Sequence, residues 1–192
     1  MVVDGSGNYL YFPEGNFTYG FSIDQTTGAL SPLFTSPFSV GMTALQAEPT
    51  GQYLLGVSAT GITDVFVIPI GPGNGILGVP IPFPTVAAPE NLAMHPSGKF
   101  LFTFAVDFTN QPLPLEGFTF DVTTATLTPM AGSPFSTLPK VVSGEFDQNG
   151  NSLIGVTGLS FTAYAIDSIT GAPSNTIPSL AVPHDERFAV TN

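Results

Sequence analysis

Short apolar segments separated by turn-forming residues recur along the whole chain. In four places a Gly-containing turn stands directly before an aromatic or aliphatic segment, and the turn glycines are Gly7, Gly51, Gly98 and Gly150. These glycines are 44, 47 and 52 residues apart. Short apolar runs bounded by Gly, Asn, Asp and Ser predict β-strands joined by tight turns.

A second marker keeps the same period. The segment 21–28, FSIDQTTG, recurs at 118–125 as FTFDVTTA and at 164–171 as YAIDSITG. Each copy predicts a strand followed by a turn in which the Asp side chain accepts hydrogen bonds from the backbone. We therefore give Asp24, Asp121 and Asp167 a structural role.

The repeats predict an all-β chain, organised as a β-propeller of four-stranded blades. Four short strands in about 40–50 residues are typical of a propeller blade. Residues 1–192 are expected to form a single repeat domain, with blades at about 1–41, 42–88, 89–138 and 139–177 and the start of a fifth at 178–192. About four complete blades form a partial ring, or one that other subunits complete. A β-sandwich and a β-solenoid remain alternatives, although a sandwich need not keep its markers in phase.

The combined pattern resembles a known family. Pro-x-Gly-x-Phe/Tyr-Leu, Phe-x-Ile-Asp-x-Thr-Thr-Gly and Ser-Pro-Phe are similar to the YVTN-type and lactonase-type seven-bladed β-propeller repeats of bacteria, over nearly the whole chain. The resemblance implies a propeller fold and, for lactonase-type members, hydrolysis of a lactone. No His/Arg catalytic set can be matched, because Arg187 is the single arginine and both histidines, His95 and His184, are expected in turns.

Charge and composition exclude several functions. The net charge is −11 at pH 7, and the basic residues are Lys99, Lys140 and Arg187 alone. A nucleic-acid backbone or an anionic membrane surface would be repelled. Pro or polar residues interrupt every apolar run well before the ~18 residues of a transmembrane segment. The absence of cysteine excludes disulfides and thiolate metal sites.

Calcium is the one cofactor that the sequence suggests, and we predict no other. Asp147-x-Asn149-x-Asn151 is similar to the start of a calcium loop, but its glycine is not at the sixth position that an EF-hand needs. The segment coincides with a predicted hairpin turn, so we interpret it as a turn. No metal-binding or catalytic residue is predicted.

Candidate ligand-binding residues lie in the loops opposite the hairpin turns, where several loops of a propeller converge. They are Glu14, Asp64, Glu90, Asp107 and Glu116, with Lys140 in a neighbouring connection. The loop 107–116 is the longest and is the expected recognition element. The alternative is that these residues are only solvated loop acids.

The predicted function is that of a non-enzymatic extracellular module that binds protein or assembles with itself through exposed blade edges. The chain would then be a homo-oligomer or part of a larger chain. The alternative is a lactonase-type hydrolase, similar to 6-phosphogluconolactonase, or a fragment of one. A surface rich in Thr, Ser, Asn and Gln suggests a secreted or cell-surface bacterial protein, and no signal peptide is recognised in this sequence.

Overall fold

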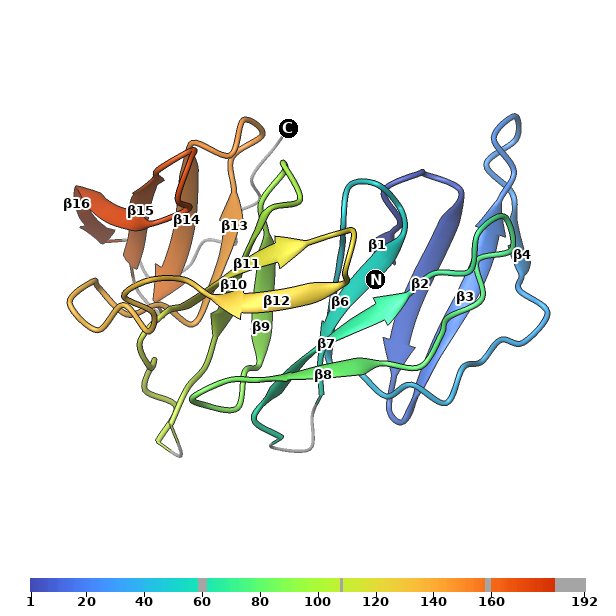
Figure 1. Cartoon of the computed structure of the whole chain (residues 1–192), viewed down its shortest axis with the longest axis horizontal. Helices are drawn as coiled ribbons and strands as arrows, with labels where there is room; N and C mark the ends of the chain where they lie inside the picture. Colours follow the sequence, from blue (N-terminus) through green and yellow to red (C-terminus); the bar gives the residue numbers. More distant parts are fainter. Residues whose placement is uncertain (59–61, 108, 158–159, 182–192) are drawn as a thin grey trace.

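The computed structural model describes residues 1–58, 62–107, 109–157 and 160–181 (Figure 1). Within these residues the chain forms four sheets, each of four antiparallel strands, and no helix. None of the described residues forms a helix that is long and apolar enough to cross a membrane. The all-β prediction is confirmed.

Each sheet is a meander in which consecutive strands pair, and we call the four sheets blades 1 to 4. Blade 1 contains β1 (Val2–Val3), β2 (Tyr9–Glu14), β3 (Phe17–Ile23) and β4 (Leu30–Pro32). Blade 2 contains β5 (Ala44–Ala47), β6 (Tyr53–Val57), β7 (Asp64–Pro69) and β8 (Ile81–Pro84). Blade 3 contains β9 (Asn91–Met94), β10 (Phe100–Phe104), β11 (Glu116–Asp121) and β12 (Thr126–Pro129). Blade 4 contains β13 (Ser143–Phe146), β14 (Ser152–Thr157), β15 (Ser160–Ile166) and β16 (Pro173–Ala181).

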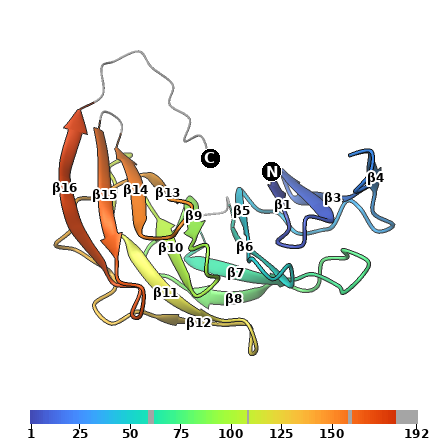
Figure 2. The same ribbon diagram turned by 90° about the horizontal axis from the view of Figure 1, so that it is seen from above.

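The blades fan out side by side in an open arc (Figure 2). The first strands of successive blades are neighbours, because β1 lies against β5, β5 against β9 and β9 against β13. These four strands are nearest the inside of the arc, and the fourth strands lie outermost. The arrangement is that of a partial β-propeller, as the repeats predict.

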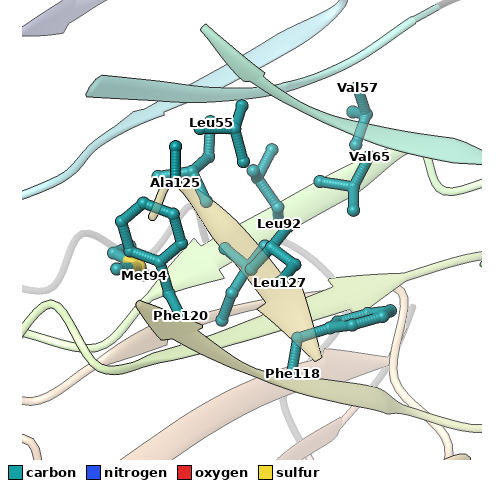
Figure 3. Packing of buried hydrophobic residues seen from close by; sticks show 11 residues of the cluster. Leu55, Val57, Val65, Leu92, Met94, Phe118, Phe120, Ala125 and Leu127 are labelled. Atoms are coloured by element: carbon teal, nitrogen blue, oxygen red, sulfur yellow. The ribbon is translucent and has the colours of Figure 1, made fainter. Parts of the chain in front are cut away.

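Three apolar clusters fill the three spaces between blades. Figure 3 shows the middle one, in which Leu55 and Val65 of blade 2 face Leu92 and Phe118 of blade 3. The other two clusters join blade 1 to blade 2 and blade 3 to blade 4. The second strands of the two middle blades, β6 and β10, therefore have buried apolar residues on both faces.

A polar, largely buried residue begins the hairpin turn between the first and second strand of blades 1 to 3. The Asp4 carboxylate accepts the N–H groups of Ser6 at 3.0 Å and Tyr9 at 2.7 Å. The corresponding residues of the next two blades are Glu48, which accepts the N–H of Thr50 at 2.7 Å, and His95, whose Nδ1 accepts the N–H of Ser97 at 3.0 Å. Asp147 holds this position in blade 4.

The turns between the third and fourth strands confirm the structural role predicted for three aspartates. Asp24 Oδ1 accepts the N–H groups of Thr26 and Thr27 at 2.9 and 2.8 Å. Asp121 and Asp167 accept equivalent bonds in blades 3 and 4. These bonds favour the charged form and hold the pKa of all three carboxyl groups below its ordinary value.

The end of blade 4 differs from the prediction. Residues 178–181 were expected to open a fifth blade, but β16 continues to Ala181 and pairs with β15, with Ser160 opposite Ala181 and Phe161 opposite Leu180. A shift of register near Ala163 takes up extra residues, so the strand reaches nine residues. The rest of the predicted fifth blade lies outside the described residues.

Candidate functional site

The five predicted site acids occupy different positions in the blades. Glu14 ends β2 and is exposed, Asp64 opens β7 and is half-buried, and Glu90 is exposed just before β9. In the part of the chain that the structure describes, no three His, Asp or Glu side chains gather as a metal site requires. These three acids stay candidates for contacts with a ligand.

Glu116 lies in a strand and not in the predicted loop. It is the first residue of β11 and is only 6% exposed. Its carboxylate accepts the N–H groups of Val86 and Ala87, at 3.0 and 3.2 Å, from the connection that leaves blade 2. Burial raises the pKa of this carboxyl group, and the two backbone donors oppose that shift. Glu116 therefore ties blade 3 to blade 2.

Asp107 organises its own loop. Its Oδ1 accepts the N–H groups of Thr109 at 2.8 Å and Gln111 at 2.9 Å, and the hydroxyl of Thr109 at 2.7 Å. These bonds, with a small contribution from Lys140, lower the pKa of the carboxyl group. The loop predicted for recognition is thus shaped by a turn of the same kind as those that close the hairpins.

A cleft of about 240 Å³ opens beside the inner strand of blade 4. It is lined by Asn91, Ser143, Gly144, Glu145, Ile154, Val156 and Phe161. Glu145 is its one acid, and partial desolvation raises the pKa of that carboxyl group. Sequence analysis missed Glu145, although an acid on a strand whose neighbours are apolar is a detectable signal.

The outer side of blade 1, which we call the blade 1 face, is apolar and uncovered. Leu10 and Phe12 of β2 pair with Phe21 and Tyr19 of β3, so all four side chains share this face. Phe12 is 42% exposed, and its ring centroid lies 6.5 Å from that of Tyr19. Phe17 at the end of the same face is also 42% exposed. Exposed apolar patches of this kind mark interaction surfaces.

The outer side of blade 4, which we call the blade 4 face, carries the cleft. Ile154 and Val156 of β14 and Phe161 of β15 lie here and are half-buried. The adjacent residues Leu153 and Tyr164 point the other way and are fully buried against blade 3. Within the described residues, the two ends of the arc are thus apolar faces without a neighbouring blade.

No family model and no curated protein matches the sequence significantly. The fold is similar to two solved structures, each called a "putative 6-phosphogluconolactonase". The one from Bacteroides uniformis has a TM-score of 0.71 and 16% identity, and that from Bacteroides fragilis has 0.69 and 17%. In both, the match covers 94% of this chain and 54% of the other. A protein from Lactobacillus plantarum matches with a TM-score of 0.66 and 16% identity, over 88% of this chain and 50% of the other.

These similarities establish the fold. The chain shares the fold of these structures and spans about half their length. At this level of identity the similarity does not extend to individual site residues.

Proposed function

We propose that the chain is a non-enzymatic β-propeller module that binds protein through the blade 1 face and the blade 4 face. The observation that carries the proposal is the blade 1 face, where Leu10, Phe12, Tyr19 and Phe21 form a continuous apolar surface across two strands. Aromatic residues are enriched in protein interfaces, and a blade face is complementary in shape to another sheet.

The placement of the acids supports binding over catalysis. Glu116 and Asp107 are the two predicted site residues whose carboxylates make several hydrogen bonds, and both bond to the protein's own backbone. Their side chains stabilise the blade-to-blade contact and the loop 107–116, and the protein keeps its apolar end faces open to a partner.

The accessibility of the end faces can be tested with the dye ANS, whose fluorescence rises on exposed apolar surface. At nanomolar protein concentration we expect dye binding by the folded chain and a clear reduction in Leu10→Asp and Ile154→Asp. Val79→Asp is the control, because Val79 is 83% exposed on blade 2 and lies on neither face. Equal fluorescence in all four proteins would contradict the proposal.

A lactonase-type hydrolase is the second candidate. It is supported by the names of the two Bacteroides structures and by the cleft that holds Glu145, Asn91 and Ser143. In this mechanism the Glu145 carboxylate takes a proton from the water that attacks the lactone carbonyl, and the ring C–O bond breaks as the leaving oxygen takes up a proton. A raised pKa suits a residue that exchanges protons near neutral pH.

Acid release from sugar lactones, 6-phosphogluconolactone included, separates the two candidates. The binding proposal expects no turnover above spontaneous hydrolysis. Turnover that Glu145→Gln abolishes and Asp24→Asn, in a turn of blade 1, leaves unchanged would establish the hydrolase and overturn the binding proposal.

Export and calcium binding stay predictions. The scarcity of Lys and Arg fits a protein outside the cell, and fractionation of the cells that produce it would test this. A calcium site would raise the melting temperature in millimolar calcium chloride, because a ligand that binds the folded state stabilises it. An unchanged melting temperature would remove calcium from consideration.

A further inference from the structure

The same residue position is buried at each interface inside the arc. The third residue after the turn glycine is Leu10, Leu54, Leu101 and Leu153 in blades 1 to 4. The last three are 0% exposed, because each packs against the preceding blade. Leu10 is half-buried on the blade 1 face. Blade 1 therefore presents a surface that, in every other blade, a preceding blade covers.

The side of each blade that faces the following blade shows the same repetition. The next residue along the second strand is Tyr11, Leu55, Phe102 and Ile154. The first three are 0% exposed against the following blade. Ile154 is only half-buried and lines the cleft. The blade 4 face is thus the other half of the same interface.

The hairpin turns form a second contact that repeats. The preceding blade approaches the turn glycines so closely that an added side chain would touch it. A Cβ added to Gly51 would lie 3.0 Å from Asp4 Oδ2, and a Cβ added to Gly98 would lie 3.3 Å from Glu48 Oε1. His95 Nε2 lies 2.9 Å from the carbonyl oxygen of Gly150 and donates a hydrogen bond to it. Each turn glycine after the first therefore lies against the polar turn residue of the preceding blade.

Both ends of this series are open. A Cβ on Gly7 would have nothing within 4 Å. At the other end, Asp147 Oδ1 is buried yet makes no hydrogen bond within the described residues. An unpaired buried acceptor is costly, so a donor supplied from outside would stabilise this turn. The side-chain amide of Asn8, beside Gly7, is exposed; it donates one N–H to Ser6 Oγ and carries a second N–H that could reach such an acceptor.

We propose that blade 4 of one copy docks on blade 1 of a second copy, and that two copies close one ring through two such contacts. The inference rests on the proposed function and names the partner. The occupant is a second copy because the two uncovered faces are the two halves of the interface that already occurs three times in the chain. Such head-to-tail contacts produce closed rings when the rotation between subunits permits.

The contact can accommodate the polar side chain of Glu145. Glu145 on the blade 4 face occupies the position of Gln46, which is half-buried in the contact between blades 2 and 3.

The net charge opposes the contact. Each copy carries a net charge of −11, so two copies repel. Because salt screens this repulsion, association is expected to strengthen as the ionic strength rises.

Sedimentation equilibrium of the 192-residue chain tests the pairing. We expect a concentration-dependent species of twice the 20.0 kDa chain mass, favoured by higher salt. A monomer at every concentration up to hundreds of micromolar would overturn the inference. A continuous series of larger oligomers would overturn the closed pair.

Complementary variants test which faces meet. Leu10→Asp destroys the blade 1 face and Ile154→Asp the blade 4 face, and burying the new charge should weaken self-association at least about 30-fold in each. A mixture of the two variants keeps one intact face on each protein and should form a one-to-one pair. Val79→Asp should pair like the original chain.

The remaining outcomes decide against the inference. Pairing of Ile154→Asp with itself would show a contact between two blade 1 faces, and no pairing in the mixture would show that the faces do not dock. Circular dichroism establishes that each variant is folded. If the original chain binds ANS at nanomolar concentration but stays monomeric, the proposed function stands and the second copy as partner is wrong.

Discussion

Different side chains hold the same position in the hairpin turns. Asp4 and Glu48 accept backbone N–H groups through a carboxylate, whereas His95 does so through Nδ1 and also donates from Nε2 to Gly150. The two bonds fix the neutral histidine with its proton on Nε2. The His95 ring also contacts Phe100 and Phe146 edge-on, at centroid distances of 5.4 and 4.9 Å. His95 is therefore a link between blades 3 and 4.

Replacing His95 by Ala should destabilise the protein by about 2–4 kcal/mol, because it removes a packed ring and leaves the Gly150 carbonyl without its donor. Urea unfolding followed by circular dichroism measures the change. Lys99→Ala is the matched control, since Lys99 is exposed in the same hairpin. Equal midpoints for the two variants would show that the link is dispensable.

Asp121 gives a pH-dependent contribution whose sign follows from its lowered pKa. The stabilisation is present above the ordinary aspartate pKa of about 3.9 and is lost as the pH falls through the lower folded-state value. Asp121→Asn should be less stable than the original at neutral pH, and the difference should shrink between about pH 5 and about pH 2. Parallel stability curves over that range would contradict this assignment.

At the scale of strands and turns, the sequence predicts the strands and the hydrogen bonds within a turn. It does not predict the contacts between blades. The strands and the turn aspartates follow from residues close in the sequence, such as Asp24 and Thr27. Glu116 could not be placed in the same way, because its partners Val86 and Ala87 are about thirty residues away in the preceding blade. Likewise, the length of β16 depends on its pairing with β15 and not on its own pattern.

Glu116→Ala should lower the free energy of unfolding by about 1–3 kcal/mol, because two backbone N–H groups lose their acceptor. Glu116→Gln keeps one acceptor oxygen and should cost less. Thermal or urea unfolding measures both changes. Glu90→Gln serves as the control, because Glu90 is an exposed acid just before β9 of the same blade. A loss there as large as in Glu116→Ala would show that the effect is not specific.

At the scale of the whole molecule, the apolar clusters between the blades hold the arc together. All three clusters in the described residues bridge two blades. In the part of the chain that the structure describes, the two middle blades are covered on both sides, whereas blades 1 and 4 are covered on one. The chain spans about half the length of the similar solved structures.

The clusters shared by neighbouring blades also determine which blades unfold most easily. A blade that contributes to two clusters cannot unfold without exposing both, whereas an end blade exposes only one. In the unpaired chain, at low protein concentration, amide hydrogen exchange should therefore be slowest in β6 and β10 and faster in β2 and β14, although all four strands are hydrogen-bonded on both edges. Uniform protection across the four strands would mean that the arc opens as one cooperative unit.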